Sequence, residues 1–559
     1  MSETLPAHGA IYFVLVDRFS NGDTRNDDTI DPTDPHAFHG GDLQGIIDHL
    51  PDIRAMGFDA VWLSPISRMR TDPIGGHGAF HGYWVSDLFE VEPRFGDEAL
   101  ASEFVDTAHD HGMTVILDMV YNHVGYDTPL VSQQPDWFHG LGDIQDWDDP
   151  FQRIHHDVHG LPDLAQEQEP VFQHLLSASQ HWIDLLEPDG FRVDAVRHLP
   201  ESFLARLHSE LRTPEGFRWL AEIFDGNPES IAESLRESKL TSAFDFPLYY
   251  AMTGAFCGGA HLGRIGSVLG LDQLYPRRGE EMVTFLDNHD LPRIASTCES
   301  ERVNLALSFQ FLMRGTPAMT YGTETGLEGA LEPDNRTDMD HDPEHPRRVL
   351  VTQLLKLRRS HPALQRGLVR IHDVDEDHLV LTRRTETEVA LVAVNLSETV
   401  STLTPAADWP SPLHPVWPPS SRDEAGGEFT EELLMGPNEL RVWVGSSAKP
   451  PPPEHPESNV SQVRFRSPRE SSEEAAPRLV GAGVWLGSWT PDHTNPAQPI
   501  DPTTWLWTGE VPPHTVLEFK RVRRGDTGWE WESGENRYVL SPGPGQTLEV
   551  NLEPWNSGP

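Results

Sequence analysis

Four short apolar runs along the chain each end in acidic, amide or histidine side chains, and this recurrence constrains the fold more than any other feature. The runs lead into Asp118–His123, Arg192–His198, Glu222–Phe224 and Asp287–Asp290, in that order. The parallel strands of a (β/α)₈ barrel present their carboxyl ends at one face, where active sites lie. Chance supplies one or two such runs, whereas four in succession indicate one barrel with one site.

Short β-branched runs alternate with longer amphipathic stretches up to about residue 365, which is typical of βα units. Behind Asp97, for example, apolar residues recur at helical spacing after an N-capping side chain. The predicted barrel strands are residues 11–16, 60–65, 114–120, 190–196, 218–224, 241–247, 282–289 and 316–322.

Arg192 and Asp194 are two residues apart on one predicted strand, so their side chains point to the same face. A neighbouring guanidinium lowers the pKa of an aspartate and keeps it ionised. An ionised, oriented carboxylate is what a nucleophile at a sugar carbon must be. A structural ion pair at a strand end explains the same pattern, and this stretch alone does not separate the two interpretations.

Taken together, the four runs resemble the signature regions of the α-amylase superfamily of retaining glycoside hydrolases and transglycosylases, in order and in spacing. The segment Leu161–Leu164 matches the supporting region of that superfamily. The resemblance covers roughly the first 445 residues. It implies a (β/α)₈ TIM barrel, a small domain B inserted at about residues 124–165, and an antiparallel β C domain.

The predicted architecture is multidomain, with boundaries at changes of composition. The catalytic barrel takes residues 1–365 and the all-β C domain takes 366–446. A proline-rich linker at 447–460 is expected to be extended and semi-rigid. Residues 461–559 are again β-rich and resemble a starch-binding module, a C-terminal immunoglobulin-like β-sandwich that binds carbohydrate.

The resemblance assigns catalytic roles to three carboxylates. Asp194 is the expected nucleophile, Glu222 the general acid and base, and Asp290 the acid that holds sugar hydroxyls in the transition state. Ile223 and Phe224 beside Glu222 favour the desolvation that raises the pKa of a general acid. The implied substrate contacts are His81, Tyr83, Trp84, His123, Arg192, Arg197, His198, Phe224, His289 and Arg336.

The resemblance also implies calcium at two sites. The first combines Asn122, Asp163 and the backbone carbonyl of His198, and hard oxygen ligands of this kind suit calcium rather than zinc. The second resembles the N-terminal loop site of cyclodextrin glycosyltransferases and some maltooligosaccharide-forming amylases, although a plain polar turn explains the same residues. Its expected ligands are Asn21, Asp23, Asn26, Asp27 and Asp42.

In the C-terminal module, the resemblance pairs two indoles as sugar-stacking platforms; the alternative is that both are ordinary core residues. Trp485 and Trp489 are interpreted as core residues or as a second, looser site. The expected sugar contacts of the module are Trp505, Lys520, Trp531 and Asn536.

The same scaffold serves hydrolysis and glycosyl transfer. The segments Asp17–Ser20 and His81–Trp84 are similar to cyclodextrin glycosyltransferases. Those transferases carry a bulky aromatic residue where this chain has His159, and an extra domain where it has the linker. We therefore predict hydrolysis of α-1,4-glucosidic bonds in starch, endo or exo, with short maltooligosaccharides as products.

Two alternatives stay open on the sequence. The first is a glucan transglycosylase of the cyclodextrin glycosyltransferase type. The second, remote alternative is a non-catalytic glucan-binding protein, although members of that kind lose the acids that Asp194, Glu222 and Asp290 provide here.

Composition limits the partners of the chain. A formal net charge of −46 disfavours nucleic acid and anionic membranes, which require basic surfaces. Cys257 and Cys298 do not form a disulfide framework, and the sequence leaves open whether they are buried thiols. The N-terminal residues lack the features of a signal peptide, so the protein is either cytoplasmic or already processed. We expect a secreted, extracellular monomer that acts on starch and maltooligosaccharides.

Overall fold

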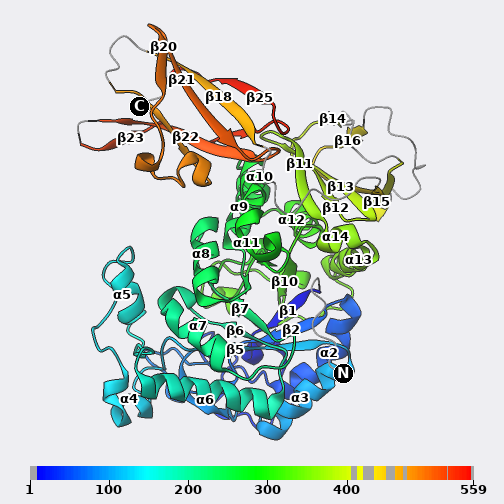
Figure 1. Ribbon diagram of the computed structural model, residues 1–559. Coiled ribbons are helices and arrows are strands. Elements are labelled where there is room, and N and C mark those ends of the chain that lie inside the picture. The colour runs from blue at the N-terminus through cyan, green and yellow to red at the C-terminus, as the bar shows by residue number, and fades with distance from the viewer. Residues whose placement is uncertain are drawn as a thin grey trace. The chain divides into compact units, whose positions relative to one another are not determined.

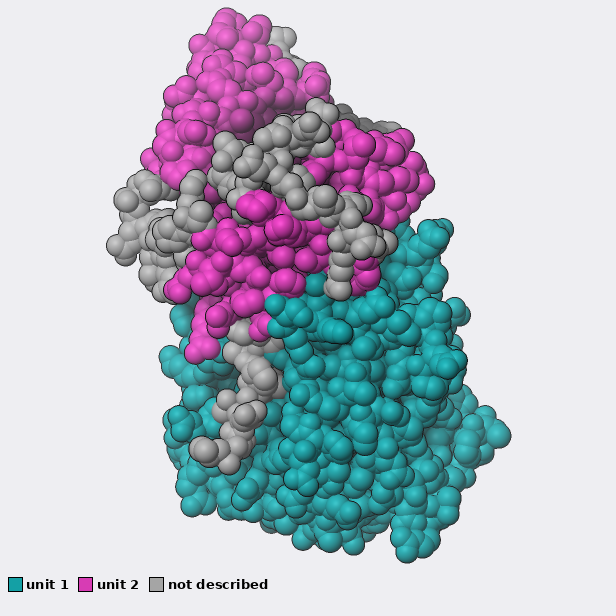
Figure 2. Space-filling view, turned by 90° about the vertical axis from the view of Figure 1, so that its right-hand side faces the viewer, with its two compact units in different colours: residues 1–249, 279–360 teal, residues 250–278, 361–559 magenta. Residues whose placement is uncertain are grey.

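The computed structural model describes residues 9–403, 412–419, 433–447, 460–469, 475–525 and 527–555. The chain forms two compact units, coloured separately in Figure 2. One unit comprises residues 1–249 and 279–360, and the other comprises 250–278 and 361–559. Most of the linker predicted at 447–460 lies outside the described residues.

The first unit contains the predicted (β/α)₈ barrel (Figure 1). Its parallel strands follow the order β8-β7-β6-β5-β2-β1-β10-β9, and a parallel bridge from Phe244 to Val283 joins the two edges of the sheet. The strands are β1 (Ile11–Val14), β2 (Ala60–Leu63), β5 (Thr114–Met119), β6 (Gly190–Val193), β7 (Arg218–Ala221), β8 (Ser242–Ala243), β9 (Val283–Thr284) and β10 (Thr316–Thr320). Each strand lies inside its predicted range, and every predicted range extends beyond the observed end of its strand.

The barrel strands are continuous apolar runs because both of their faces are covered, and β1, β2, β5 and β6 are buried throughout. Asp97 caps α3 as predicted, since its side chain accepts a hydrogen bond from Leu100 N. The helices of the first unit are α1 (Val16–Phe19), α2 (Leu43–Met56), α3 (Glu98–Asp110), α4 (Pro129–Gln133), α5 (Pro150–His155), α6 (Glu169–Leu186), α7 (Glu201–Glu210), α8 (Pro228–Ser238), α11 (Ile294–Thr297), α12 (Ser300–Leu312) and α13 (Pro346–Ser360). Helix α9 (Phe246–Gly258) follows β8.

The insertion after β5 contains α4, α5, a 3₁₀ helix at Pro135–Trp137 and otherwise irregular backbone, which agrees with the irregular segment predicted at 124–165. An isolated bridge from His123 to Asp163 joins the start of the insertion to its end. The short hairpin of β3 (Ser67–Met69) and β4 (Val85–Val91) lies earlier in the chain. These segments carry several of the side chains of the candidate site.

The second unit includes an antiparallel sheet in the order β11-β12-β13-β17-β15, where an all-β domain was predicted. Val389, Leu391 and Trp443 belong to its apolar core. The strands are β11 (Leu368–Val374), β12 (His378–Arg384), β13 (Glu388–Asn395), β14 (Ser401–Leu403), β15 (His414–Trp417), β16 (Leu433–Met435) and β17 (Glu439–Ser446). The α-helices that lie wholly in the described part of this unit are α10 (Gly263–Gly270) and α14 (Pro362–Arg366), and α9 runs from the first unit into it.

The C-terminal segment forms two facing four-stranded sheets. One has the order β20-β21-β18-β25, and in the other β22 pairs with β19, β23 and β24. Phe465, Trp507 and Phe519 pack in the core between them. The strands are β18 (Ser461–Pro468), β19 (Arg478–Gly481), β20 (Gln498–Asp501), β21 (Thr504–Val511), β22 (Val516–Arg524), β23 (Trp529–Trp531), β24 (Arg537–Leu540) and β25 (Thr547–Asn551).

Two further properties bear on the expectations from sequence. Among the helices of the described ranges, none combines the length and the hydropathy that a bilayer crossing requires. Cys257 and Cys298 are both disulfide-bonded, so neither is a buried free thiol.

Candidate active site

The carboxyl ends of β5, β6 and β7 place three acids around one buried guanidinium. Asp118 on β5 lies opposite Arg192 on β6 in the parallel register. Arg192 Nη1 donates to both oxygens of Asp118, at 2.8 and 3.0 Å, and to Asp194 Oδ1 at 2.7 Å. Its Nη2 lies 2.7 Å from Glu222 Oε1. Two of the three predicted catalytic acids therefore share a single cation.

Additional donors orient the same carboxylates. The Tyr83 hydroxyl donates to Asp118 Oδ2 at 2.9 Å, and the indole N–H of Trp62 donates to the same oxygen at 3.1 Å. The backbone N–H of Ala195 donates to Glu222 Oε2 at 3.0 Å. Acids held from two directions keep one orientation, which a reaction at a defined carbon requires.

The acids of this cluster have strongly shifted pKa values. Burial, opposed by Arg192, raises the pKa of Asp194 to about 7 and the pKa of Glu222 to about 7. Burial also raises the pKa of Asp118 to about 6. Because one guanidinium cannot balance three buried carboxylates, the cluster retains a proton close to neutral pH. A retaining pair needs one ionised and one protonated carboxyl, and this arrangement can supply both.

Asp290 lies in the loop that follows β9. Arg336 Nη2 is 3.0 Å from its Oδ1, and His289 Nε2 is 3.1 Å from its Oδ2. Burial acts to raise the pKa of Asp290, but the neutral His289 ring, as an N–H donor at Nε2, and the guanidinium groups of Arg336 and Arg192 together lower it below its usual value. Asp290 is therefore ionised at neutral pH and can accept hydrogen bonds from sugar hydroxyls.

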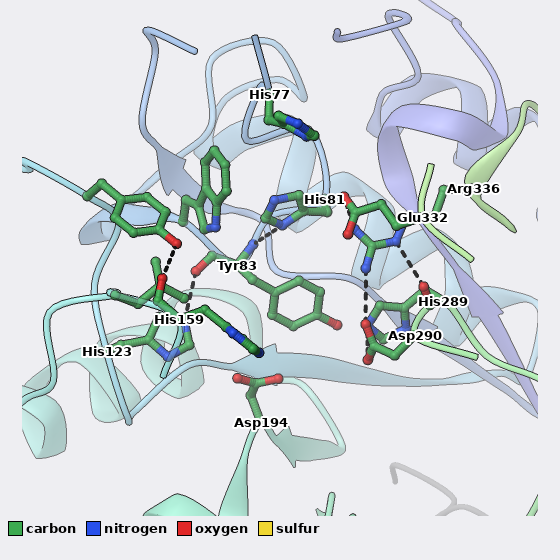
Figure 3. A pocket seen from close by; sticks show the side chains of 13 residues that line it. His77, His81, Tyr83, His123, His159, Asp194, His289, Asp290, Glu332 and Arg336 are labelled. Carbon is green, nitrogen blue, oxygen red and sulfur yellow. Dashed lines mark hydrogen bonds and ion pairs between the residues drawn. The ribbon is translucent and has the colours of Figure 1, made fainter. Parts of the chain in front are cut away.

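A cavity of about 420 Å³ opens beside these acids, and Figure 3 shows Asp194 on one side of it and Asp290 with Arg336 on another. Its volume is within the range of small-molecule sites. The predicted residues that line it are His81, Tyr83, Trp84, His123, Asp194, His289, Asp290 and Arg336. His77, Tyr126, His159, Leu161 and Glu332 complete the lining.

Neutral histidines and a stacked tyrosine surround the cavity. Burial lowers the pKa of His123 to about 4 and the pKa of His289 to about 3. The Tyr83 ring stacks on His289 with centroids 5.1 Å apart and 3° between the planes. His123 Nε2 lies 3.2 Å from the Tyr83 carbonyl oxygen. Uncharged imidazoles and a flat aromatic face are suited to a neutral sugar.

Four predicted substrate contacts do not line this cavity, and one of them, Arg192, instead binds Asp118, Asp194 and Glu222. Arg197 Nη1 donates to the carbonyl oxygen of Phe224 at 3.1 Å, and the side chain of Phe224 is 40% exposed. The His198 ring packs against Trp147 of the insertion, with centroids 5.9 Å apart. Arg197, His198 and Phe224 therefore form a second group, on the loops that follow β6 and β7.

Asp118 and Glu332 are the acids that the sequence reasoning missed as site residues. Glu332 lies 2.9 Å from Arg336 Nη1, on the opposite side of that guanidinium group from Asp290. The sequence carries a signal for each. Asp118 is the penultimate residue of the strand next to that of Arg192, and Glu332 precedes Arg336 by four residues.

Asn122, Asp163 and the His198 carbonyl converge where the insertion begins and ends. The Asn122 side-chain amide lies 3.2 Å from Asp163 Oδ1 and 2.9 Å from His198 O. If the amide nitrogen of Asn122 faces these two atoms, it donates a hydrogen bond to each of them. If the amide oxygen faces them instead, the oxygens of Asn122, Asp163 and His198 converge. Three converging oxygens fit a hard cation such as calcium.

The loop predicted as a second cation site has mixed features. Asp23 pairs with Arg25 at 2.7 Å, so its charge is already balanced. Asn26 Oδ1 is buried without a hydrogen-bond partner, and a cation would satisfy this oxygen. Asn21 Nδ2 donates to Asp27 at 2.9 Å. The carboxylate of Asp42 accepts from Gly22 N, Asp23 N, Asn26 Nδ2 and Gly45 N. The donor set here fits calcium less well than the set at Asn122.

Trp505 is a core residue of the C-terminal sandwich, which corrects its assignment as a sugar platform. Its side chain is 4% exposed and packs in the same core as Trp507. Alternate residues of β21 face inward, and both indoles lie on that face. Trp531 on β23 is 43% exposed, so only one indole of the predicted pair is available to a ligand.

The remaining predicted contacts of the module lie around β22. Lys520 Nζ donates to Gly534 O at 2.6 Å, and Asn536 Nδ2 donates to Glu518 Oε1 at 2.6 Å. Trp489 is partly exposed, and its backbone N–H donates at 2.9 Å to the carbonyl of Gly481, a residue of β19. Because β19 and β23 both pair with β22, Trp489 and Trp531 flank the strand that carries Lys520.

The chain is similar to known proteins over most of its length. The family described as alpha amylase, catalytic domain, matches residues 13–352. A β/α-amylase of Paenibacillus polymyxa is 32% identical over 411 residues, which are 69% of this chain; the chain spans about a third (33%) of that protein's length. A cyclomaltodextrin glucanotransferase of Klebsiella oxytoca is 27% identical over 95% of this chain and 92% of its own. The crystal structure of an Anoxybacillus α-amylase superposes with a TM-score of 0.74, at 32% identity, over 79% of this chain and 98% of that one.

Proposed function

The chain belongs to the alpha-amylase family of glycoside hydrolases, and from this premise we propose that it hydrolyses α-1,4-glucosidic bonds of starch and related glucans with retention of anomeric configuration. The observation that carries the proposal is the Arg192 fork, which binds both Asp194 and Glu222 at 2.7 Å. A shared guanidinium keeps the two carboxyls close together, and a short separation is the geometry of retaining enzymes.

In the first step, Glu222 gives its proton to the glycosidic oxygen while the Asp194 carboxylate attacks the anomeric carbon from the opposite face. The bond between that carbon and the leaving oxygen breaks, and a glycosyl ester forms on Asp194. In the second step, Glu222 takes a proton from a water molecule, which attacks the same carbon and releases Asp194. Asp290 holds the sugar hydroxyls through both steps.

Proton NMR of the first products tests this proposal. Digestion of a maltooligosaccharide by a retaining enzyme releases the α-anomer first, and mutarotation then adds the β-anomer. Early accumulation of the β-anomer would refute retention. Chromatography of the products from soluble starch over time gives the chain length; short maltooligosaccharides are expected.

Glycosyl transfer is the second candidate, because the similarity to a cyclomaltodextrin glucanotransferase extends over 95% of the chain. His159 favours hydrolysis. It lines the cavity with a positive φ of 53°, where those transferases carry a bulky aromatic ring. A small polar ring leaves more room for water as the acceptor. Cyclic products as the main output from starch would favour transfer, whereas linear sugars with rising reducing power would favour hydrolysis.

We also propose one calcium ion at Asn122, Asp163 and the His198 carbonyl. Bound calcium would join the insertion to the barrel and stabilise the native state by mass action. Excess chelator is expected to lower the melting temperature, and Asp163→Ala should remove most of that response. Elemental analysis of the purified protein covers the case of a very tightly held ion. Calcium-free protein with an unchanged melting curve in chelator would contradict the site.

The starch-binding role of the C-terminal sandwich belongs to the same proposal. Trp531 with Trp489, rather than Trp505, is the pair that we infer to contact glucan, with Lys520 between them on β22. A polymeric substrate does not cross a bilayer, which supports the expectation that the enzyme acts outside the cell. Detection of the enzyme in culture supernatant, with none released by lysis alone, tests the location.

A further inference from the structure

Helix α10 has an unusual composition for a helix. Three of its eight residues are glycine: Gly263, Gly266 and Gly270. The interior glycine, Gly266, costs the helix roughly 0.5–1 kcal/mol relative to alanine, and a helix of eight residues is marginal in water by itself, so α10 has little stability of its own. The three glycines are spaced i, i+3, i+7 and therefore lie on one face of the helix. Something packed against that face has to stabilise the helix.

The C-terminal sandwich covers this glycine face. A Cβ on Gly263 would lie 2.5 Å from Tyr538 Cγ on β24. A Cβ on Gly266 would lie 2.7 Å from Val516 Cγ2, at the start of β22, and a Cβ on Gly270 would lie 2.9 Å from the Thr515 methyl group. Contacts this short exclude any larger side chain without movement. The sandwich therefore approaches the helix backbone more closely than a side chain on these glycines would permit.

Polar and aromatic contacts extend the same interface. The His261 ring stacks on Tyr538 with centroids 4.6 Å apart and 26° between the planes. Arg370 Nη2 on β11 lies 3.0 Å from His514 Nε2 in the loop before β22. Leu262 N donates to Glu376 O at 3.0 Å, after β11. Helix α10, the C domain and the sandwich thus form one continuous contact within the second unit.

We propose that the glycine face of α10 is a built docking surface for the C-terminal sandwich, which is thereby an integral part of the fold and not a module tethered only by the linker. Docking supplies the stability that this short helix lacks by itself. In sequence, α10 lies between barrel strands β8 and β9, and β9 leads to Asp290. Release of the sandwich therefore loosens the chain that leads into the catalytic loop. The docking itself does not depend on the proposed hydrolysis.

A double-mutant cycle on the full chain tests the docking. Gly266→Ala adds a methyl group against Val516, and we expect the melting temperature to fall by roughly 3–8 °C. Val516→Ala makes room for that methyl group, so in the Val516→Ala background the Gly266→Ala substitution should lower the melting temperature by less than half as much as it does in the wild type. The matched control is Gly258→Ala, a helical glycine whose Cβ would meet nothing within 4 Å. Because alanine is the better helix former, this control should melt at or above the wild-type temperature.

The outcomes are distinct. Strict additivity of the two substitutions, or a Gly266→Ala variant as stable as Gly258→Ala, would overturn the proposal. If Gly266→Ala does not fold, the double variant should still fold, and its failure to do so would count equally against the proposal.

Turnover on a short soluble maltooligosaccharide should fall at least twofold in Gly266→Ala and recover in the double variant. Wild-type turnover at a reduced melting temperature would overturn the link to the catalytic loop. A chain without hydrolytic activity would refute the proposed function and leave the thermal cycle valid.

Discussion

The mouth of the barrel and the face of the C-terminal sandwich both carry residues that motifs single out, but the fold positions them by different rules. At the barrel mouth, parallel register brings strand ends together, so Asp118 and Arg192 meet because β5 and β6 are neighbours. On the sandwich, the alternation of side chains along a strand decides exposure, and it turns Trp505 inward. A motif is therefore sufficient to locate a residue at the end of a strand. For a residue within a strand, one must also know which face of the sheet its side chain is on.

Removal of a catalytic acid should have the largest effect and should separate the two regions. Glu222→Gln cannot donate a proton, and Asp194→Asn cannot form the ester, so each should lower kcat on soluble starch by about 10⁴-fold or more. Adsorption to granular starch should stay at the wild-type level. A variant that kept more than about a tenth of the activity would contradict the assignment.

Trp505→Ala and Trp531→Ala should distinguish the role of a buried indole in the sandwich core from the role of an exposed indole on its surface. Loss of the buried Trp505 indole should destabilise the sandwich by about 3–5 kcal/mol, measured by denaturant unfolding. Loss of the exposed Trp531 indole should leave unfolding unchanged and weaken granule adsorption about tenfold, by removal of roughly 1.4 kcal/mol of apolar contact. The reverse pattern would show that the exposures of these two indoles do not govern their roles.

Arg192→Lys tests whether one guanidinium organises the barrel site. Lysine keeps the charge but cannot bind Asp194 and Glu222 through two terminal nitrogens, so kcat/KM should fall by about 10²-fold. A nearby cation lowers the pKa of a carboxylate. Because lysine contacts Asp194 less well than arginine does, the pKa of Asp194 should rise, and the acidic limb of the pH profile should move to higher pH. The exposed Arg206→Lys on α7 serves as the control and should behave as wild type. Equal profiles for both variants would exclude an organising role for Arg192.

A change of pH should have the smallest effect of these tests, and it should affect catalysis at the barrel mouth but not adsorption by the sandwich. Burial raises the pKa of Glu222 to about 7, and a general acid is active only while protonated. Activity on a soluble substrate should therefore fall as pH rises through about 7, approaching tenfold per pH unit, while granule adsorption stays level. A basic limb near pH 5, close to the ordinary pKa of a glutamate, would contradict the buried environment of Glu222.

The barrel strands could be predicted from sequence because each is a buried run with apolar residues on both faces. The residues at which the strands end were harder to predict, and β8 and β9 have only two residues each. Most of the cavity lining was predictable too, since His123, Asp194 and His289 lie within or beside signature regions. His77 comes from a loop whose path no local pattern specifies, so it could not be placed in advance.

The sequence alone determined the succession of strands and helices and the identity of the acids that follow β6, β7 and β9, because these depend on local periodicity and on neighbours in the chain. Only the tertiary structure decided that one guanidinium joins Asp118, Asp194 and Glu222, and that burial raises their pKa values. It also decided that Trp505 lies in a core and that α10 presents its glycines to the sandwich. Burial and close approach depend on residues far apart in the chain, and no local pattern specifies them.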